Sequence, residues 1–164
     1  LFAKTKQAAA RLSKQMQQDT LNKQYYALIC GKPEQSKGMF VDYLQKDAKA
    51  NVSKVVSKES KEAKRAELEY EVLKTVYVQA HEQMPVTLVK IHLITGRHHQ
   101  IRVQFASRRH QLYGDGKYGS RQKGSIALQS CGLRFVHPDT GKPMAFSLPL
   151  PAAAPWKEFL ELGE

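Results

Sequence analysis

The sequence is poor in cysteine, has no long apolar run and is short of acidic residues. Its two cysteines, Cys30 and Cys131, lie in apolar stretches. This placement predicts buried thiols in a reducing, cytoplasmic compartment, with a single disulfide as the alternative. No stretch approaches the roughly 18 apolar residues that a membrane helix needs, and no signal peptide is apparent.

Motifs for metals, nucleotides and nucleophilic catalysis are also lacking. Histidines occur at His92, His98, His99 and His110, but no cysteine pair and no HExxH motif accompanies them. Adjacent histidines point apart on any regular element, so His98 and His99 are a poor pair of metal ligands. The segment "GDGKYG" lacks the spacing of a phosphate-binding loop. We therefore predict neither a metal nor a cofactor.

Positive charge is abundant. Only 15 acidic residues oppose 26 lysines and arginines, which leaves a net charge of +11 and a pI near 9.7. This excess favours an acidic partner, with nucleic acid first and an anionic membrane second. A length of 164 residues with 41% hydrophobic residues suits one folded domain.

The apolar periodicity predicts an α+β fold with a mixed, mainly antiparallel sheet and flanking helices. A helix is expected over 6–21, and the first residues resemble the end of an earlier strand. The spacing of Ile101 and Phe105 predicts another helix within 98–109. Strands are expected over 24–31, 36–44, 66–79 and 84–94, with two more around the turn at 137–143 and a short helix over 155–162.

Two segments concentrate the positive charge. Residues 46–65 hold seven lysines and arginines against three acids, which predicts a basic, mobile connection or, alternatively, a flap that touches a phosphate backbone. Residues 95–124 hold seven against one acid, Asp115. Arginines interleaved with histidine and glutamine suit phosphates and unpaired bases, although a solvated surface with one ion pair is the simpler interpretation.

The spacing within the second segment is specific. The stretch "LITGRHHQIRVQFA" at 93–106 resembles the "TGR-[TS]-HQ-[IL]-RV" motif of RluA-type RNA pseudouridine synthases. Further resemblances follow in the family's order: "NKQYYALICG", "AELEYEVL", "YGDGKYG" and "LRFVHPDTGKPMAFSLPLP". The resemblance covers nearly the whole chain and is weakest over 33–62, so residues 1–164 are expected to form the C-terminal portion of the catalytic domain.

The resemblance implies an enzyme that isomerises uridine to pseudouridine in rRNA or tRNA without cofactor or metal, acting on a flipped uridine. Tyr25 would pack on the uracil and take the proton from C5, and Arg102 would pair with the nucleophilic aspartate. Leu128 would line the uracil pocket. Without the resemblance, Tyr25 would be interpreted as a core residue and Arg102 as a surface residue.

The neighbouring basic and polar residues receive two roles. Arg97, Arg108 and Arg109 are expected to face RNA phosphates. His99 and Gln100 are expected to hold the loop in place through hydrogen bonds to backbone groups.

The departures from the family pattern bear on activity. No "HRLD" occurs in the 164 residues, and the resemblance puts the aspartate of that motif about eight residues before Leu1. Asp115 is expected to be structural, so this chain alone should be inactive. His98 and Gln104 also differ from the family pattern, which leaves the choice of RNA open. The alternatives are a non-catalytic RNA-binding module descended from the enzyme and a basic, ribosome-associated protein.

Overall fold

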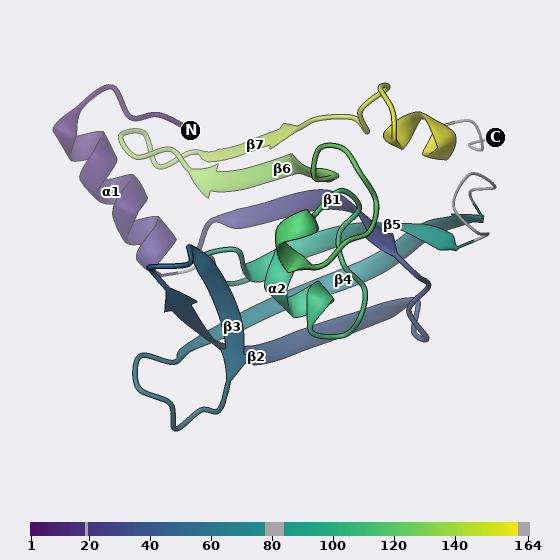
Figure 1. Ribbon diagram of the computed structural model, residues 1–164. Coiled ribbons are helices and arrows are strands. Elements are labelled where there is room, and N and C mark those ends of the chain that lie inside the picture. Colours follow the sequence, from purple (N-terminus) through teal and green to yellow (C-terminus); the bar gives the residue numbers. More distant parts are fainter. Residues whose placement is uncertain (19, 78–83, 161–164) are drawn as a thin grey trace.

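The computed structural model describes residues 1–18, 20–77 and 84–160, and its centre is one seven-stranded sheet in the order β3-β2-β4-β5-β1-β6-β7 (Figure 1). Every pairing in it is antiparallel. The predicted α+β class is confirmed, with an antiparallel rather than a mixed sheet. The strands are β1 (Asn22–Cys30), β2 (Lys37–Asp47), β3 (Val52–Val56), β4 (Lys64–Tyr77), β5 (Pro85–Leu93), β6 (Leu128–Val136) and β7 (Pro143–Ser147).

Two α-helices and two short 3-10 helices complete the described chain. Helix α1 spans Lys6–Gln17, and α2 spans Gln100–Ala106. The helices predicted over 6–21 and within 98–109 are therefore confirmed, each shorter than expected. The 3-10 helices are η1 (Gly116–Tyr118) and η2 (Trp156–Phe159). Residues 1–5 form no strand, and the ends of the expected 66–79 strand and 155–162 helix lie outside the described residues.

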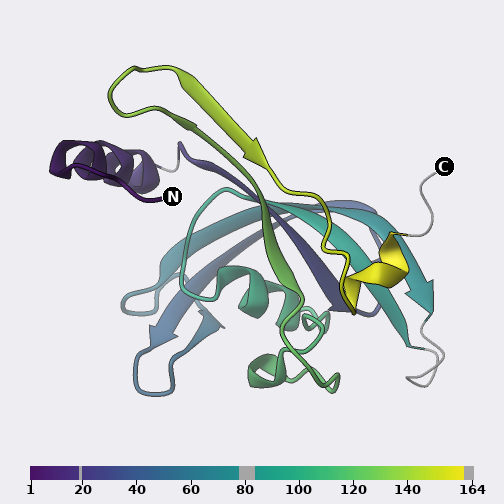
Figure 2. The ribbon, with the colours of Figure 1, turned by 90° about the horizontal axis from the view of Figure 1, so that it is seen from above.

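The sheet curves over α2 and the segment that follows it (Figure 2). On this inner face Ile101 and Phe105 of α2 pack against Leu68 of β4 and Ile91 of β5. The i, i+4 spacing of the two helical residues puts both side chains on the face that meets the sheet. The inner face therefore holds the main core and fixes the position of α2.

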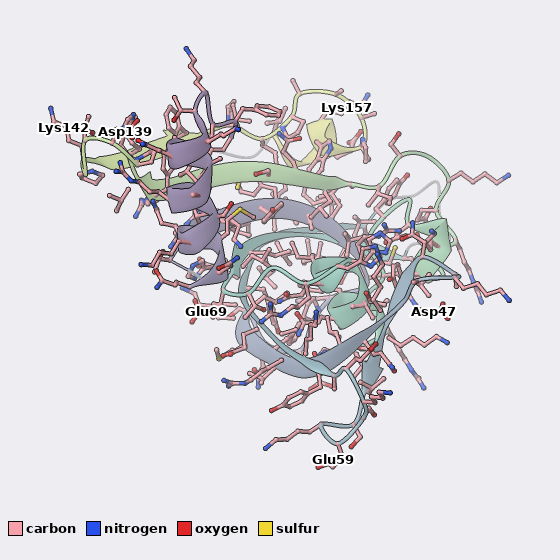
Figure 3. The ribbon with its side chains drawn as sticks, turned by 90° about the vertical axis from the view of Figure 1, so that its left-hand side faces the viewer. Asp47, Glu59, Glu69, Asp139, Lys142 and Lys157 are labelled. Carbon is pink, nitrogen blue, oxygen red and sulfur yellow. The ribbon has the colours of Figure 1, made fainter. Side chains whose placement is uncertain are left out.

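The other face is apolar only in part. Trp156 and Phe159 of η2 pack there against Leu28 and Leu88. Elsewhere the outer face carries polar side chains. On β4, for example, Leu68 and Tyr70 point toward α2, and Glu69 between them points away. Glu69 is labelled on this outer side in Figure 3.

Segment 46–65 forms more secondary structure than the predicted connection. It contains the end of β2, all of β3 and the start of β4. Asp47 lies at the end of β2 and Glu59 in the turn between β3 and β4 (Figure 3). β3 pairs only with β2 in the described sheet, so it forms an edge of that sheet.

Cys30 and Cys131 are both buried and free, as predicted from their apolar surroundings. No helix in the described ranges is long and apolar enough to cross a membrane.

Candidate active site

The site is built around the loop that enters α2. The amide oxygen of Gln100 accepts hydrogen bonds from the Thr95 hydroxyl and the Arg97 backbone N–H, both at 2.9 Å. Its amide nitrogen donates to the Glu67 carbonyl at 3.0 Å. Gln100 is only 2% exposed, so these bonds form away from water and hold residues 95–97 against β4.

His99 follows a sharp turn of the backbone and joins two parts of the site. It caps α2 in the left-handed region at φ 51°. Arg102 Nη1 donates to His99 Nε2 at 3.0 Å, and an arginine can only donate. His99 Nε2 therefore accepts, which leaves the proton on Nδ1, and Nδ1 donates to the Tyr118 hydroxyl at 3.1 Å.

The charge state of His99 agrees with this arrangement. Burial, followed by the charges of Arg102, His98 and Lys117, lowers the pKa of His99 to about 4. The ring is therefore neutral at pH 7 and keeps one nitrogen free to accept from Arg102. Unlike Gln100, His99 bonds to side chains rather than to backbone groups.

Arg102 and Asp115 form a bidentate ion pair, called the fork below. Arg102 Nε donates to one oxygen of Asp115 and Nη2 to the other, each at 2.8 Å. The Asp115 side chain is 0% exposed and that of Arg102 is 14% exposed. The hydrogen bond to Asp115 raises the pKa of Arg102. Asp115 therefore takes up the Nε and Nη2 side of the Arg102 guanidinium.

Gly114 lets the chain bring Asp115 inward. Its φ is +76°, and a Cβ placed there would lie 2.3 Å from the Ser125 carbonyl oxygen. Only glycine meets both conditions without strain. The "GD" pair of "YGDGKYG" thus has a structural basis, since the glycine permits the turn that buries the acid. A lone acid next to a glycine in a basic stretch was the sequence signal for this pair.

Tyr118 was not singled out in the sequence, and it links the site to β3. Its hydroxyl accepts from the Ser53 backbone N–H at 2.8 Å and from His99. Its ring lies beneath the Arg102 guanidinium, 5.0 Å from Cζ to the ring centroid. A path of contacts therefore runs from Asp115 through Arg102, His99 and Tyr118 to Ser53.

Tyr25 and Leu128 lie together on the inner face of the sheet. Tyr25 pairs with Ser130, and Leu128 pairs with Ala27, so the two are diagonal neighbours across β1 and β6. Both are partly buried against the cluster that contains Ile101 of α2. Tyr25 and Arg102 make no hydrogen bond or ring contact with each other in the described part of the chain.

The other three predicted RNA-facing arginines differ in how many partners their guanidinium groups already have. Arg108 donates to both oxygens of Asp42, at 2.9 and 3.1 Å, and its Cζ lies 3.9 Å from the Phe40 ring centroid. Arg108 is thus engaged by a carboxylate and a ring. Arg97 uses only Nε, which donates to the Arg65 carbonyl, and Arg109 is exposed after α2 with φ 63°.

No metal centre is found among the described residues, since no group of three or more histidines, cysteines and acids is placed to share an ion. His98 and His99 stack on each other, with ring centroids 3.8 Å apart.

The structure is thus an antiparallel α+β domain with a buried arginine–carboxylate pair beside a basic loop. The family profile described as RNA pseudouridylate synthase matches residues 1–107. The chain belongs to the RluA-type RNA pseudouridine synthase family.

Similar proteins span the family. The chain is 29% identical over 160 residues to ribosomal large subunit pseudouridine synthase C of Vibrio vulnificus, covering 92% of this chain and 47% of that protein. It is 30% identical over 158 residues to tRNA pseudouridine synthase C of Salmonella typhimurium, covering 88% and 60%. The chain therefore spans about half the length of such relatives.

Among solved structures, human RNA pseudouridylate synthase domain containing 1 superposes with a TM-score of 0.76. The match has 23% identity and covers 92% of this chain and 63% of the human one. At this identity the likeness supports the fold.

Proposed function

We propose that this chain is the C-terminal portion of the catalytic domain of an RNA uridine isomerase that works in the cytoplasm on rRNA or tRNA. The observation that carries the proposal is the Arg102–Asp115 fork on a chain of this family. The named relatives act on ribosomal and transfer RNA, which supports RNA as the partner. No cofactor or metal is required in the proposed reaction.

In the proposed reaction a carboxylate supplied from outside these 164 residues allows the N-glycosidic bond to break, and the uracil rejoins the ribose through C5. C5 then loses its proton to solvent, and N1 takes one up. Arg102 has five N–H donors, and three of them are bonded to Asp115 and His99. The two others are available to hold that carboxylate in its ionised form. Asp115 acts as a positioning residue, because its buried oxygens face Arg102 and not the substrate.

Tyr25 and Leu128 would receive the flipped uracil on the inner face. A flat ring and an apolar side chain suit a base removed from its stack. Burial raises the pKa of Tyr25, which disfavours the phenolate that a proton acceptor at C5 would need. Packing against the base is therefore the role of Tyr25 that its environment supports best.

The roles of the other three arginines are assigned according to whether a carboxylate already binds the guanidinium. Arg97 and Arg109 are proposed to face RNA phosphates. Arg108 is reassigned to a structural role, because Asp42 occupies both of its terminal nitrogens. Binding a phosphate there would break an ion pair that is already formed and partly buried.

The test is tritium release from C5-labelled uridine in rRNA and tRNA pools, using the full natural protein that carries this chain. Release with the full protein and none with residues 1–164 alone is the expected result. Salt-sensitive RNA binding without release by the full protein would instead indicate the non-catalytic RNA-binding module.

A further inference from the structure

A basic hollow lies on the inner side of the sheet, between the β2–β3 hairpin and the loop that enters α2. Its volume is about 510 Å³. It is lined by Leu44, Lys46, Ser53, Glu62, Lys64, Gly96, Arg97 and His98. None of the residues proposed to hold the uracil, and neither Arg102 nor Asp115, lines it.

The strand register brings the lysines to one face. Lys46 of β2 pairs with Ser53 of β3, and Leu44 pairs with Lys64 of β4. Cross-strand partners point to the same face of a sheet, as do residues two apart on one strand. Leu44 packs into the cluster that contains Val103 of α2. The lysines are therefore on the inner face, which also carries the candidate active site.

The opposite wall comes from the loop before α2. Arg97 Nε donates to the Arg65 carbonyl at 2.9 Å, which anchors the guanidinium and leaves both terminal nitrogens without a partner among the described residues. The Ser53 hydroxyl donates to the His98 carbonyl at 2.7 Å and accepts from His98 Nδ1 at 3.1 Å. His98 is thus held by a serine that is 3% exposed, and its Nε2 has no partner within the described ranges of the chain.

The charge in the hollow is unbalanced. Lys46, Lys64 and Arg97 are opposed by one acid of the lining, Glu62, and none of the three cations is in an ion pair with another described residue. After burial, the charges of Lys46, Arg102 and Lys117 lower the pKa of His98. A hollow of about 480 Å³ on the other face differs, because its Lys37 and Glu71 neutralise each other at 2.9 Å. Unpaired cations around a hollow favour an anion.

The hollow adjoins the candidate active site. His98, on its wall, stacks on His99, and His99 accepts from Arg102. An anion bound in the hollow would therefore be separated from the Arg102–Asp115 pair by His98 and His99, on the same side of the sheet. A strand of RNA carries a phosphate at every nucleotide, so a strand with one base at the fork has further phosphates close by.

We propose that this hollow seats one backbone phosphate of the substrate RNA, at a nucleotide next to the target uridine. The inference rests on the proposed function for the nature of the ligand. Arg97 and the two lysines supply the charge, and the Ser53–His98 pair holds the wall in place. The site reads no base, so it positions the strand without choosing the sequence.

The first test uses the full natural protein and RNA binding as a function of salt. The pocket variant Lys46→Gln/Lys64→Gln is compared with Lys54→Gln/Lys58→Gln, which removes the same charge from the same region outside the hollow. Lys54 follows Ser53 on β3 and therefore points to the other face. We expect the pocket variant to lose about tenfold in affinity and to lower the salt slope by about 0.7.

A third variant should change the RNA affinity in the opposite direction. Glu62→Gln removes the single acid of the lining and should tighten RNA binding. Equal losses in both lysine variants, or no loss in either, would overturn the proposal, because charge in the hollow would then have no special weight.

The second test needs no turnover and no RNA. Inorganic phosphate is titrated into the wild-type protein while the amide signals of Ser53, Gly96 and His98 are followed by NMR, with sodium chloride at matched ionic strength as the control. Saturable shifts with phosphate alone are expected. Absence of such shifts overturns the phosphate site, whereas absence of tritium release with these shifts intact overturns only the proposed reaction.

Discussion

Arg102 and Asp115 meet in two hydrogen bonds of 2.8 Å, and the carboxylate is closed off from solvent. Removing one partner of such a pair leaves the other charge poorly solvated. We therefore expect Asp115→Ala to lower the free energy of unfolding by about 3 kcal/mol or more, measured by urea denaturation. Asp139→Ala is the control, because its pair with Arg11 is 54% exposed on both sides and should cost under about 1 kcal/mol. Equal losses would show that burial adds nothing.

Arg102→Lys tests the fork separately from the charge. Lysine keeps the positive charge but cannot bond both Asp115 oxygens in the plane of a guanidinium. In the full natural protein we expect turnover to fall by about a hundredfold with RNA affinity within a few-fold of wild type. Loss of affinity with turnover unchanged would contradict the proposed role of Arg102.

Gly114→Ala should destabilise the protein more than Gly119→Ala. Both glycines have positive φ, +76° and +87°, but a Cβ at Gly119 meets nothing within 4 Å. The control therefore carries only the cost of the left-handed backbone, about 1–2 kcal/mol. At Gly114 the Ser125 carbonyl must also move, which should bring the total above about 3 kcal/mol in urea denaturation. Similar costs would mean that the Ser125 loop yields freely.

Tyr118→Phe should loosen the edge strand β3. The change removes the hydroxyl that accepts from the Ser53 N–H and from His99, at a cost of about 1–2 kcal/mol. Hydrogen exchange at the Ser53 amide should become faster. Tyr77→Phe, at a residue 66% exposed, should change neither quantity, and an unchanged Ser53 exchange rate in Tyr118→Phe would rule out the link.

His99 should make the protein less stable in acid. Its pKa is about 4 in the folded state and about 6.5 when unfolded. Between these values the unfolded chain binds more protons, so the free energy of unfolding falls as the pH drops from about 6.5 to about 4. Asparagine tolerates the φ of 51° and does not titrate. His99→Asn should therefore lose about 2 kcal/mol less than wild type across this window, measured by urea denaturation at several pH values. Parallel curves for the two proteins would exclude His99 as the cause.

The sequence by itself determined the main elements and the family. The i, i+4 pair Ile101 and Phe105 places α2 correctly because a local spacing decides which side of a helix is apolar. The motif at 93–106 likewise singled out Arg102 as a candidate site residue. The strand β3 within segment 46–65 was harder to predict from the sequence. Lysine-rich stretches lie on both sides of it, and its pairing with β2 stabilises it, which is not a local property.

Only the tertiary structure decided what each charged side chain binds. Arg102 and Asp115 are 13 residues apart, and Arg108 and Asp42 are 66 apart. No periodicity connects such positions, and the composition of a basic stretch is the same whether an arginine meets a carboxylate or solvent. The fold engages Arg102 and Arg108 in internal pairs. It leaves Arg97, Lys46 and Lys64 without an ion pair among the described residues and with one acid, Glu62, beside them. Coulombic pairing acts over a few ångströms, so the partners of these cations follow from the way the chain packs.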